Sequence, residues 1–564
     1  MKKSRPGAIA LYLAAVIVFI AAAYYVTLPP MSIYSGAFWT FLFLVDAVIF
    51  VSYFVVNILA GTMFAASIRF PSGNIDFRES YRSGKRRVFL KIQSIVTLLA
   101  IAFIVLGSIV SSEVFRAKTY SSLINVENAD FAADIAETEY VSDIALMDSA
   151  SARIIGARTL GTLSDLVSQY NVAGTYTQIA MADGKGGTAP YKVAPLEYAS
   201  FFKWITNQAS GIPGYVRVDP VKFDAEFVRL DKAGDGYIRY SPSAYFSYDL
   251  SRALRFAYPG AIFGSVYFEV DDSGHPYWIA SVMKPNAGLF GAFDVESVVT
   301  LDACTGETAR YKPAEAPEWI DIVYSGDLIC RKYDWYGMLR GGYINSAFSQ
   351  TDCVVTTNDF GYKIIGNDVY VFTGVTSTSN DEANIGFILA NSRTGEYRYY
   401  SVPGAEEYSA MSAAEGSVQQ YRYTASFPSL INVDGEATYI MVLKDASGIV
   451  KMYSMVNVRN YNIVVTSTTQ DEVFRNYKAA LSQSLGKTDA DSSYSAKITV
   501  ADIVYVTQNG ETTVYLKSDD GLVFGMPFDE SVLFIGEGDA VTVYCYSEPD
   551  NADGTVIRAV RVEK

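Results

Sequence analysis

Few side chains outside the acidic residues could carry out covalent or acid–base chemistry. His275 is the single histidine of the 564-residue chain, and it stands beside Pro276 after a turn. The four cysteines are Cys304, Cys330, Cys353 and Cys545. A Ser-His-Asp or Cys-His arrangement would depend on His275 alone, and one histidine with four cysteines does not favour a zinc site. We therefore expect no catalytic triad, no metal site and no bound cofactor.

Carboxylates are the remaining candidates for catalysis. The chain has 60 acidic residues and 42 tyrosines, and two carboxylates framed by aromatic rings can hydrolyse a glycosidic bond. The spacing of the acidic residues does not identify such a pair. A carboxylate-dependent hydrolase of envelope glycan therefore stays open as an alternative function.

Two polar side chains interrupt the apolar N-terminal part of the chain. Asp46 lies near the middle of the second apolar stretch, where an ionised carboxylate is costly, so we expect it to be neutral, paired or turned to a polar interior. One interpretation is a proton or ion path, which would make the chain a subunit of a membrane transport complex. We favour the other, a hydrogen bond between helices. Asn57, near the inner end, is expected to form similar contacts.

Three apolar stretches are long enough to cross a membrane as helices. They cover 7–26, 37–60 and 94–110, each close to the roughly 20 residues that a span needs. Three basic residues precede the first stretch and seven lie in the loop 61–93, whereas the connector 27–36 carries no charge. Lys and Arg near span ends stay in the cytoplasm. This pattern therefore predicts a protein of the cell membrane whose N-terminus and basic loop lie on the cytoplasmic side, with the bulk of the chain on the extracytoplasmic side.

A cleaved signal peptide is an alternative for the first stretch, since Ala21, Ala22 and Ala23 supply small residues for cleavage. The apolar core continues through Val26, which favours a span. In both interpretations the basic loop is cytoplasmic and the region after the third stretch is extracytoplasmic.

The charge of the outer region excludes one class of partner. Residues 1–112 carry ten basic and three acidic side chains, which leaves 35 basic and 57 acidic residues in the remainder, a net charge of −22. A field of this sign repels polyanions. We therefore expect no nucleic acid among the partners.

The cysteines allow two interpretations. All four lie in the predicted outer region, where oxidation can occur, and Cys330 with Cys353 is the best candidate for a disulfide. Buried free thiols are an equally open alternative, because unpaired cysteine behaves as a small apolar residue.

A hairpin unit occurs twice. A strand over 298–301 leads into Thr305, Gly306 and Glu307, and 89 residues later a strand over 387–389 leads into Thr394, Gly395 and Glu396. The correspondence extends to Glu318 with Glu407, and 433–453, with a turn at 445–448, is a candidate for a third, degraded copy. We infer an internal duplication, with chance similarity between two ordinary hairpins as the alternative.

The two stretches 302–307 and 391–396 resemble the final hairpin of PepSY-type modules, which are similar to peptidase propeptides. The resemblance covers about 20 residues in each copy, at 298–311 and 386–400. It implies a domain that binds or restrains a protein partner at the membrane face rather than an enzyme.

The C-terminal part has a strand pattern of its own. A polar linker, 487–495, precedes five predicted strands within 496–564, with turns at Asn509-Gly510 and Asp520-Gly521. Five such strands resemble a small OB-like barrel. Its acidic residues argue against a polyanionic ligand, so we expect a structural role.

These observations predict a membrane-anchored α+β protein. Its parts are a three-helix anchor (1–112), a stalk (113–140), an α+β extracytoplasmic domain (141–486), the linker and the barrel. We expect a non-enzymatic binding or scaffold protein of the cell envelope that contacts the bilayer and a protein partner, with a homo-oligomer left open.

Overall fold

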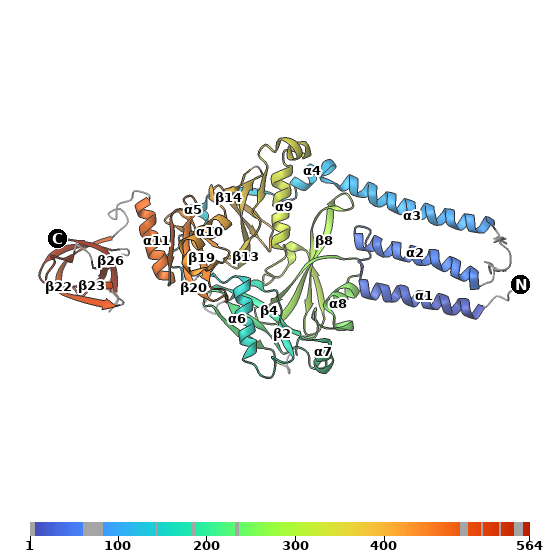
Figure 1. The fold of residues 1–564 in the computed structure, drawn as a ribbon, viewed down its shortest axis with the longest axis horizontal. Coiled ribbons are helices and arrows are strands. Elements are labelled where there is room, and N and C mark those ends of the chain that lie inside the picture. The colour runs from blue at the N-terminus through green and yellow to red at the C-terminus, as the bar shows by residue number, and fades with distance from the viewer. Residues whose placement is uncertain are drawn as a thin grey trace, which may run out of the picture. The chain divides into compact units, whose positions relative to one another are not determined.

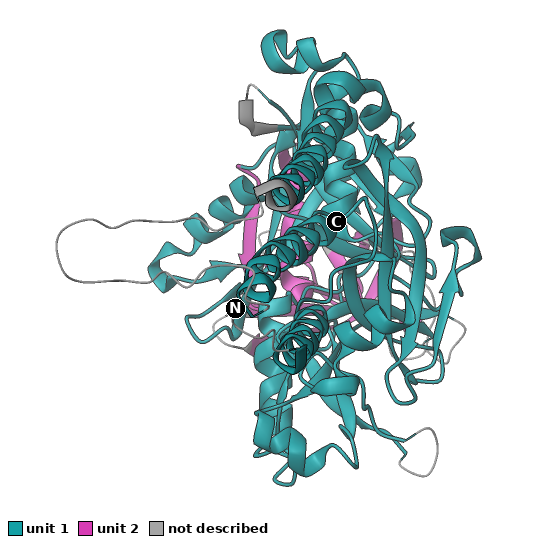
Figure 2. Ribbon diagram, turned by 90° about the vertical axis from the view of Figure 1, so that its right-hand side faces the viewer, with its two compact units in different colours: residues 1–461 teal, residues 462–564 magenta. Residues whose placement is uncertain are grey.

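The computed structural model describes residues 6–59, 83–142, 144–182, 187–231, 236–378, 380–484, 494–508, 511–528, 532–545 and 556–564 (Figure 1). Two compact units divide the chain, Met1–Tyr461 and Asn462–Lys564 (Figure 2). Residues 61–82 of the predicted basic loop and 487–493 of the predicted linker lie outside the described residues.

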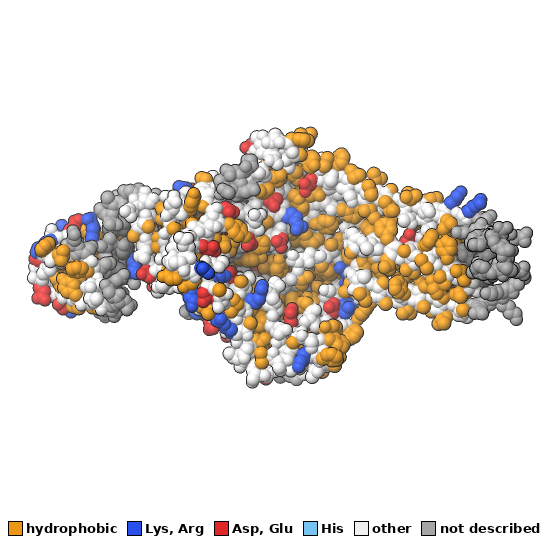
Figure 3. Space-filling view, viewed as in Figure 1, with side chains coloured by type: hydrophobic (Ala, Val, Ile, Leu, Met, Phe, Trp, Pro, Cys, Tyr) orange, Lys and Arg blue, Asp and Glu red, His pale blue; other side chains and the backbone are white. Residues whose placement is uncertain are grey.

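Three N-terminal helices are long and apolar enough to cross a membrane, which confirms the three predicted apolar segments. They are α1 (Pro6–Thr27), α2 (Gly36–Leu59) and α3 (Ser83–Ser111). The hydroxyls of Tyr12 and Ser52 lie 3.0 Å apart between α1 and α2. At most 6% of each apolar window is buried within the chain, and hydrophobic side chains cover the three helices in Figure 3. An exposed apolar surface of this extent is suited to lipid.

The segment 113–140, predicted to be a stalk, is instead part of the large domain, which we define as 113–461. It forms α4 (Glu113–Ser121), β1 (Val126–Ala129) and α5 (Phe131–Asp134). β1 pairs in parallel with β15 (Tyr397–Tyr400), and the buried ring of Tyr120 packs edge to face on Trp335 at 5.0 Å. The prediction was wrong because the few apolar side chains of this segment have no regular period and yet are the buried ones.

Four times in the large domain a helix is followed by an antiparallel meander of strands. We name these segments repeat 1 (149–229), repeat 2 (250–311), repeat 3 (326–400) and repeat 4 (407–457). Their elements are α6 (Ser149–Gly161), β2 (Tyr170–Val172), β3 (Thr177–Ala182), β4 (Thr188–Tyr198), α7 (Phe201–Asn207), β5 (Gly214–Asp219) and β6 (Asp224–Arg229) in repeat 1; α8 (Leu250–Ala257), β7 (Ile262–Val270), β8 (Pro276–Ala287), β9 (Gly291–Asp302) and β10 (Thr308–Tyr311) in repeat 2; α9 (Gly326–Leu339), β11 (Val354–Thr356), β12 (Gly361–Ile365), β13 (Asp368–Ser377), β14 (Asn380–Asn391) and β15 in repeat 3; and α10 (Glu407–Ser417), β17 (Thr424–Ala425), β18 (Ser429–Val433), β19 (Glu436–Lys444) and β20 (Val450–Asn457) in repeat 4.

Each repeat builds its own sheet. The strand orders are β2-β4-β5-β6 with β3 on β4, β10-β9-β8-β7, β1-β15-β14-β13-β11 with β12 on β13 and β16 (Gly404–Ala405) on β14, and β17-β19-β20 with β18 on β19. In Figure 1 the sheets of repeats 1 and 2 are green and those of repeats 3 and 4 are yellow to orange. The predicted large mixed α/β region is confirmed.

One strand of each repeat, namely β5, β9, β14 or β20, ends in Asp or Asn. These residues are Asp219, Asp302, Asn391 and Asn457. In repeats 1 to 3 one side-chain oxygen accepts the backbone N–H groups two and three residues later, at 2.8–3.0 Å, and Asn457 accepts from the third following residue at 2.8 Å. Such a side chain replaces a backbone group of the turn. The chain then needs a positive φ at Gly306 (+81°) and Gly395 (+75°), which is why glycine follows threonine in both predicted turns.

The candidate third copy from the sequence corresponds to repeat 4, but its register differs. The sequence aligns its turn with 445–448, which is the hairpin between β19 and β20. The structural counterpart of the Thr-Gly-Glu turns begins at Asn457. The alignment failed because both kinds of turn have an Asp or Asn shortly before a Gly, four residues before it in Asp302–Gly306 and three in Asp445–Gly448.

Repeats 3 and 4 hold this turn with an ion pair. Asp368 lies two residues before the strand partner of Asn391, and it pairs with Arg393 at 2.6 Å. Asn391 also donates to Asp368 at 2.8 Å. The corresponding residues of repeat 4, Glu436 and Arg459, pair at 3.5 Å. In each repeat the pair joins the start of one strand, β13 or β19, to the turn after the next strand, β14 or β20.

Five strands of the second unit close into a barrel. They are β22 (Tyr494–Gln508), β23 (Glu511–Ser518), β24 (Val523–Pro527), β25 (Ala540–Cys545) and β26 (Val556–Glu563), in the order β22-β23-β24-β26-β25. Only β24 and β26 pair in parallel among them. Leu516, Phe524 and Val543 are fully buried in its core. This unit also contains β21 (Val464–Ser467) and α11 (Gln470–Ser484).

Hydrogen bonds join the large domain to the ends of the spans. The Arg255 side chain of α8, 7% exposed, donates to the carbonyl of Leu28, just after α1, at 3.0 Å. At the last residue of α3, the Ser111 hydroxyl accepts from the N–H groups of Leu289 and Phe290, in the β8–β9 hairpin, at 2.8 and 3.1 Å. These bonds satisfy groups that helix and strand ends leave unpaired.

Three carboxyl groups are buried between elements. Glu269 accepts from the N–H groups of Asp321 and Ile322 at 2.9 and 3.1 Å, and Asp321 accepts from that of Ala180 at 2.9 Å. Burial raises the pKa of Glu269 to about 7 and, with the neighbouring Glu269 charge, raises that of Asp321 well above its usual range. Glu407, the third, is 0% exposed and accepts from the N–H of Gly374 at 2.7 Å.

We predict that Glu407→Gln makes stability less sensitive to pH. Burial raises the pKa of Glu407 from 4.5 to about 7. The stabilisation by the protonated carboxyl is therefore complete below pH 4.5 and is lost as the pH rises through 7. An amide can keep the Gly374 bond without ionising. Between pH 5 and pH 8 the variant should gain on the order of 3 kcal/mol in unfolding free energy relative to the parent, measured by chemical denaturation in detergent.

The matched control is Glu318→Gln. The sequence aligns Glu318 with Glu407, but the structure leaves Glu318 exposed, so its variant should follow the parent at both pH values. An equal response of the two variants would contradict the role of burial.

Candidate ligand pocket

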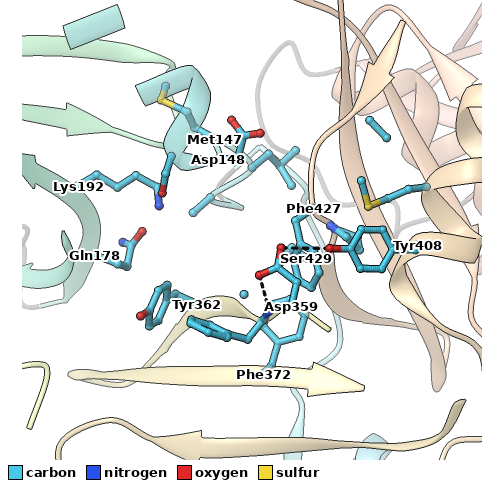
Figure 4. A pocket seen from close by; sticks show the side chains of 18 residues that line it. Met147, Asp148, Gln178, Lys192, Asp359, Tyr362, Phe372, Tyr408, Phe427 and Ser429 are labelled. Atoms are coloured by element: carbon cyan, nitrogen blue, oxygen red, sulfur yellow. Dashed lines mark hydrogen bonds between the residues drawn. The ribbon is translucent and has the colours of Figure 1, made fainter. Parts of the chain in front are cut away.

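A cavity of about 510 Å³ lies where repeats 1, 3 and 4 meet (Figure 4). Repeat 1 contributes Gln178, Lys192 and the segment before α6, repeat 3 contributes 359–362 and Phe372, and repeat 4 contributes part of α10 and 425–429. The volume falls within the range of small-molecule sites. No single repeat encloses this space.

Two polar side chains enter the cavity from neighbouring strands. Gln178 on β3 is the direct strand partner of Lys192 on β4, so both side chains leave the same face of the sheet. They are 5% and 7% exposed, and Figure 4 shows both directed into the cavity. The Gln178 amide donates to the carbonyl of Tyr191 at 3.1 Å, which fixes its orientation.

Lys192 differs from the other buried lysines. Lys332 donates to both oxygens of Asp294 at 2.8 Å, and Lys444 forms an ion pair with Asp148. Within the described residues, the Lys192 ammonium makes neither a hydrogen bond nor an ion pair. Burial lowers the pKa of Lys192 to about 8, and the charge of Asp148 opposes this shift. Because Asp148 already pairs with Lys444 and caps α6 through the N–H of Ser151 at 2.8 Å, it leaves Lys192 without a counter-ion.

The opposite wall of the cavity is aromatic. Phe360 and Tyr362 pack edge to face at 5.6 Å, and Phe372 packs on Phe427 at 5.8 Å. Asp359, which is exposed, accepts from the N–H of Phe360 at 2.8 Å and from the Tyr408 hydroxyl at 3.4 Å. The site therefore combines a buried cation, an amide and a largely apolar surface.

The residues singled out by the sequence lie elsewhere. None of Asp46, Asn57, the two Thr-Gly-Glu turns or the cysteines lines the cavity. Asp46 accepts hydrogen bonds from Gln93 and, at 2.8 Å, from Thr97, both on α3. Asn57 donates to the carbonyl of Tyr53, one turn earlier in α2, at 2.7 Å. The hydrogen bonds of Asp46 join α2 to α3, and that of Asn57 lies within α2.

Cys330 and Cys353, the candidate disulfide pair, are not bridged, which agrees with the alternative of unpaired thiols. Cys353 contacts the carbonyl of Met338 at 3.5 Å, and Met338 lies about 12 Å further along α9 than Cys330 at the helical rise. That separation exceeds what a disulfide spans. Burial raises the pKa of Cys330 to about 12, so its thiol is unreactive.

His275 lies in the hairpin of repeat 2 at the position of Asp368 in repeat 3. Its Nε2 is 3.1 Å from Asp302, and the possible ligand atoms of His275, Asp302 and Cys304 lie within 4.8 Å of one another. Burial raises the pKa of Asp302, but the N–H groups of Thr305 and Cys304 and then His275 lower it further, for a net decrease. Because Asp302 stands at the position of Asn391, we interpret the contact as the counterpart of the Asn391–Asp368 hydrogen bond of repeat 3.

Comparison with known protein families finds no family that matches the chain, and no curated protein matches its sequence. Function is therefore inferred from the geometry of the chain itself. No sequence signal marks Lys192, because an isolated lysine in a strand is ordinarily exposed. Only the packing of distant repeats buries it.

We predict that Lys192 reacts with acetic anhydride with a midpoint near pH 8. Burial disfavours the ammonium, so the neutral, nucleophilic amine forms about two pH units lower than in an exposed lysine. Competitive labelling across pH 6 to 11 with mass-spectrometric quantification measures the midpoint of each lysine. Lys284, whose side chain is 59% exposed, is the reference. A midpoint for Lys192 as high as that of Lys284 would contradict its burial in a low-dielectric site.

Proposed function

We propose that this chain is a non-enzymatic, membrane-anchored binding protein of the cell envelope that takes a small ligand between repeats 1, 3 and 4. The Lys192 ammonium carries the proposal. A buried cation without a partner is costly, and the buried Lys332 and Lys444 both pair with a carboxylate. A ligand would supply what Lys192 lacks.

The carboxylates favour binding over hydrolysis. Glu269 and Asp321 are close together but are 0% and 3% exposed, so substrate has no access to them. Near the cavity, Asp148 is held by Lys444 and α6, and Asp359 is held by Phe360 and Tyr408. A glycosidase needs one free acid and one free base or nucleophile. These engaged groups do not support that alternative.

We also propose that the large domain is extracytoplasmic. It contacts the end of the spans at which the uncharged connector 27–36 lies, away from the basic residues, which supports this orientation. Tyr24, Tyr25 and Phe256 gather at the same end, with ring centres 6.2–6.4 Å apart from Tyr to Phe. Aromatic rings at a span end are typical of a membrane interface.

Three further proposals concern a protein partner, the fold of the barrel and the role of Asp46. The Asx turns that recur in four repeats support the PepSY-like resemblance, which implies a protein partner for the large domain as well. The Greek-key order of the barrel, with its parallel β24–β26 pair, supports an OB-like fold with a structural role. The bonds from Gln93 and Thr97 to Asp46 support helix packing rather than a transport path.

The binding function predicts a small molecule that copurifies with the chain. Protein extracted from its native membrane and then denatured should release about one molecule per chain, detected by liquid chromatography and mass spectrometry. Ser429→Phe, which fills the cavity, should reduce the released amount by at least about tenfold because it removes the space for a ligand. Ser447→Phe, in an exposed hairpin, is the control. Release of nothing from the parent, or equal release from both variants, would refute the proposal.

The orientation predicts protease sensitivity. Protease added to sealed, right-side-out vesicles should digest the large domain, because it lies on the accessible side. A cytosolic marker should stay intact and a surface marker should be degraded in the same sample. A large domain that survives under these conditions would place it in the cytoplasm.

A further inference from the structure

We propose that the ligand of the cavity is a small monoanion, an organic carboxylate with an aromatic or branched apolar body, whose charged group binds Lys192. This inference rests on the proposed binding function and specifies its ligand class. Three features of the site carry it: the sign of the buried charge, the apolar wall and the acidic groups nearby.

The sign of the charge comes from Lys192. Its ammonium is the only cationic group that lines the cavity among the described residues, and Asp148 is already paired with Lys444. A neutral ligand would leave the ammonium unpaired, and a metal ion would be repelled. An anion gains a charge-assisted hydrogen bond in a low-dielectric site, where such bonds are strong.

The neighbouring Gln178 fits a carboxylate in particular. Its side chain leaves the same face of the sheet as Lys192, one strand away. A carboxylate has two oxygens, so one can pair with the ammonium while the other approaches the amide. A planar group of this size matches the spacing of two directly opposed strand residues.

The aromatic side chains of the cavity indicate that the uncharged part of the ligand is apolar. Phe360, Tyr362, Phe372 and Phe427 line the cavity, and they offer an apolar surface of the kind that small-molecule sites use for most of their contact. Figure 4 shows Phe372 and Phe427 across the cavity from Lys192. A small inorganic anion would leave this surface wet and unused. An apolar body of drug-like size fills the 510 Å³.

The acidic groups limit the total charge. Asp148 and Asp359 both line the cavity, and each accepts a hydrogen bond from a backbone N–H group. A nucleotide or another polyanion would bring several negative charges against these carboxylates. A monoanion needs only one cation, which Lys192 supplies.

Paired probes test the assignment. In isothermal titration calorimetry on the full chain in nanodiscs, 4-phenylbutyrate should bind at least about tenfold more tightly than the uncharged 4-phenylbutyramide, because only the acid pairs with Lys192. Lys192→Met keeps the apolar stem and should abolish this preference. Lys363→Met is the matched control: Lys363 also has a pKa lowered to about 8 by burial, but it donates to the carbonyl of Leu430 at 2.8 Å and does not line the cavity.

A second measurement shows direct contact. In the parent, 4-phenylbutyrate should raise the midpoint of Lys192 acylation, because an anion favours the ammonium, and it should leave that of Lys363 unchanged. Lys192→Met removes a buried charge, so its unfolding midpoint should equal or exceed that of the parent, which separates lost binding from misfolding.

The following outcomes would overturn the assignment: equal binding of acid and amide, no binding of either probe, or an acid preference that persists in Lys192→Met. They leave the binding function itself to be judged by the molecule released on denaturation. If that molecule is neutral, the function stands and the ligand class is wrong.

Discussion

The large domain depends on one recurring interaction, the acceptance of backbone N–H groups by the Asp or Asn that ends β5, β9, β14 and β20. This turn sets the register of the hairpin that it closes: β5 with β6, β9 with β10, and β14 with β15. In a strand, a shift of one residue would move every side chain to the other face. The cavity depends on register in the same way, because direct pairing between β3 and β4 places Gln178 and Lys192 on one face.

The same turn marks what the sequence could and could not predict. Thr-Gly-Glu identified the turns at Asp302 and Asn391, because a glycine at a positive φ leaves a visible signal. The equivalent turns at Asp219 and Asn457 were missed, since Phe223 supplies the positive φ (+57°) in repeat 1 and no glycine follows Asn457 in repeat 4. A turn could be predicted from sequence where its backbone conformation requires one residue type, here glycine. The fourfold repetition needed the pairing of strands, which local sequence does not contain.

The cavity belongs to the part that could not be predicted. Its lining spans 145–429, and each wall comes from a different repeat. Hydropathy identified the spans because each span is one continuous run of apolar residues, which a local stretch of sequence reveals. In contrast, Lys192 and Tyr362 are 170 positions apart, and neither has a neighbour in sequence that reveals its role. The stalk was wrong and the pairing of the cysteines stayed open for the same reason, because both are decided by long-range contacts of Tyr120 and of α9.

The buried arginine at the membrane end gives the anchor a further role. Arg255 donates to the carbonyl of Leu28 beyond α1 and to those of Tyr258, Pro259 and Ala261 beyond its own helix. If the large domain rotated about the spans, this guanidinium would lose a partner while still buried, a change that costs several kcal/mol. Ser111 imposes the same constraint at α3 through two N–H groups of the β8–β9 hairpin. With two such attachments at separate spans, the anchor holds the large domain, and the cavity within it, in one orientation to the membrane.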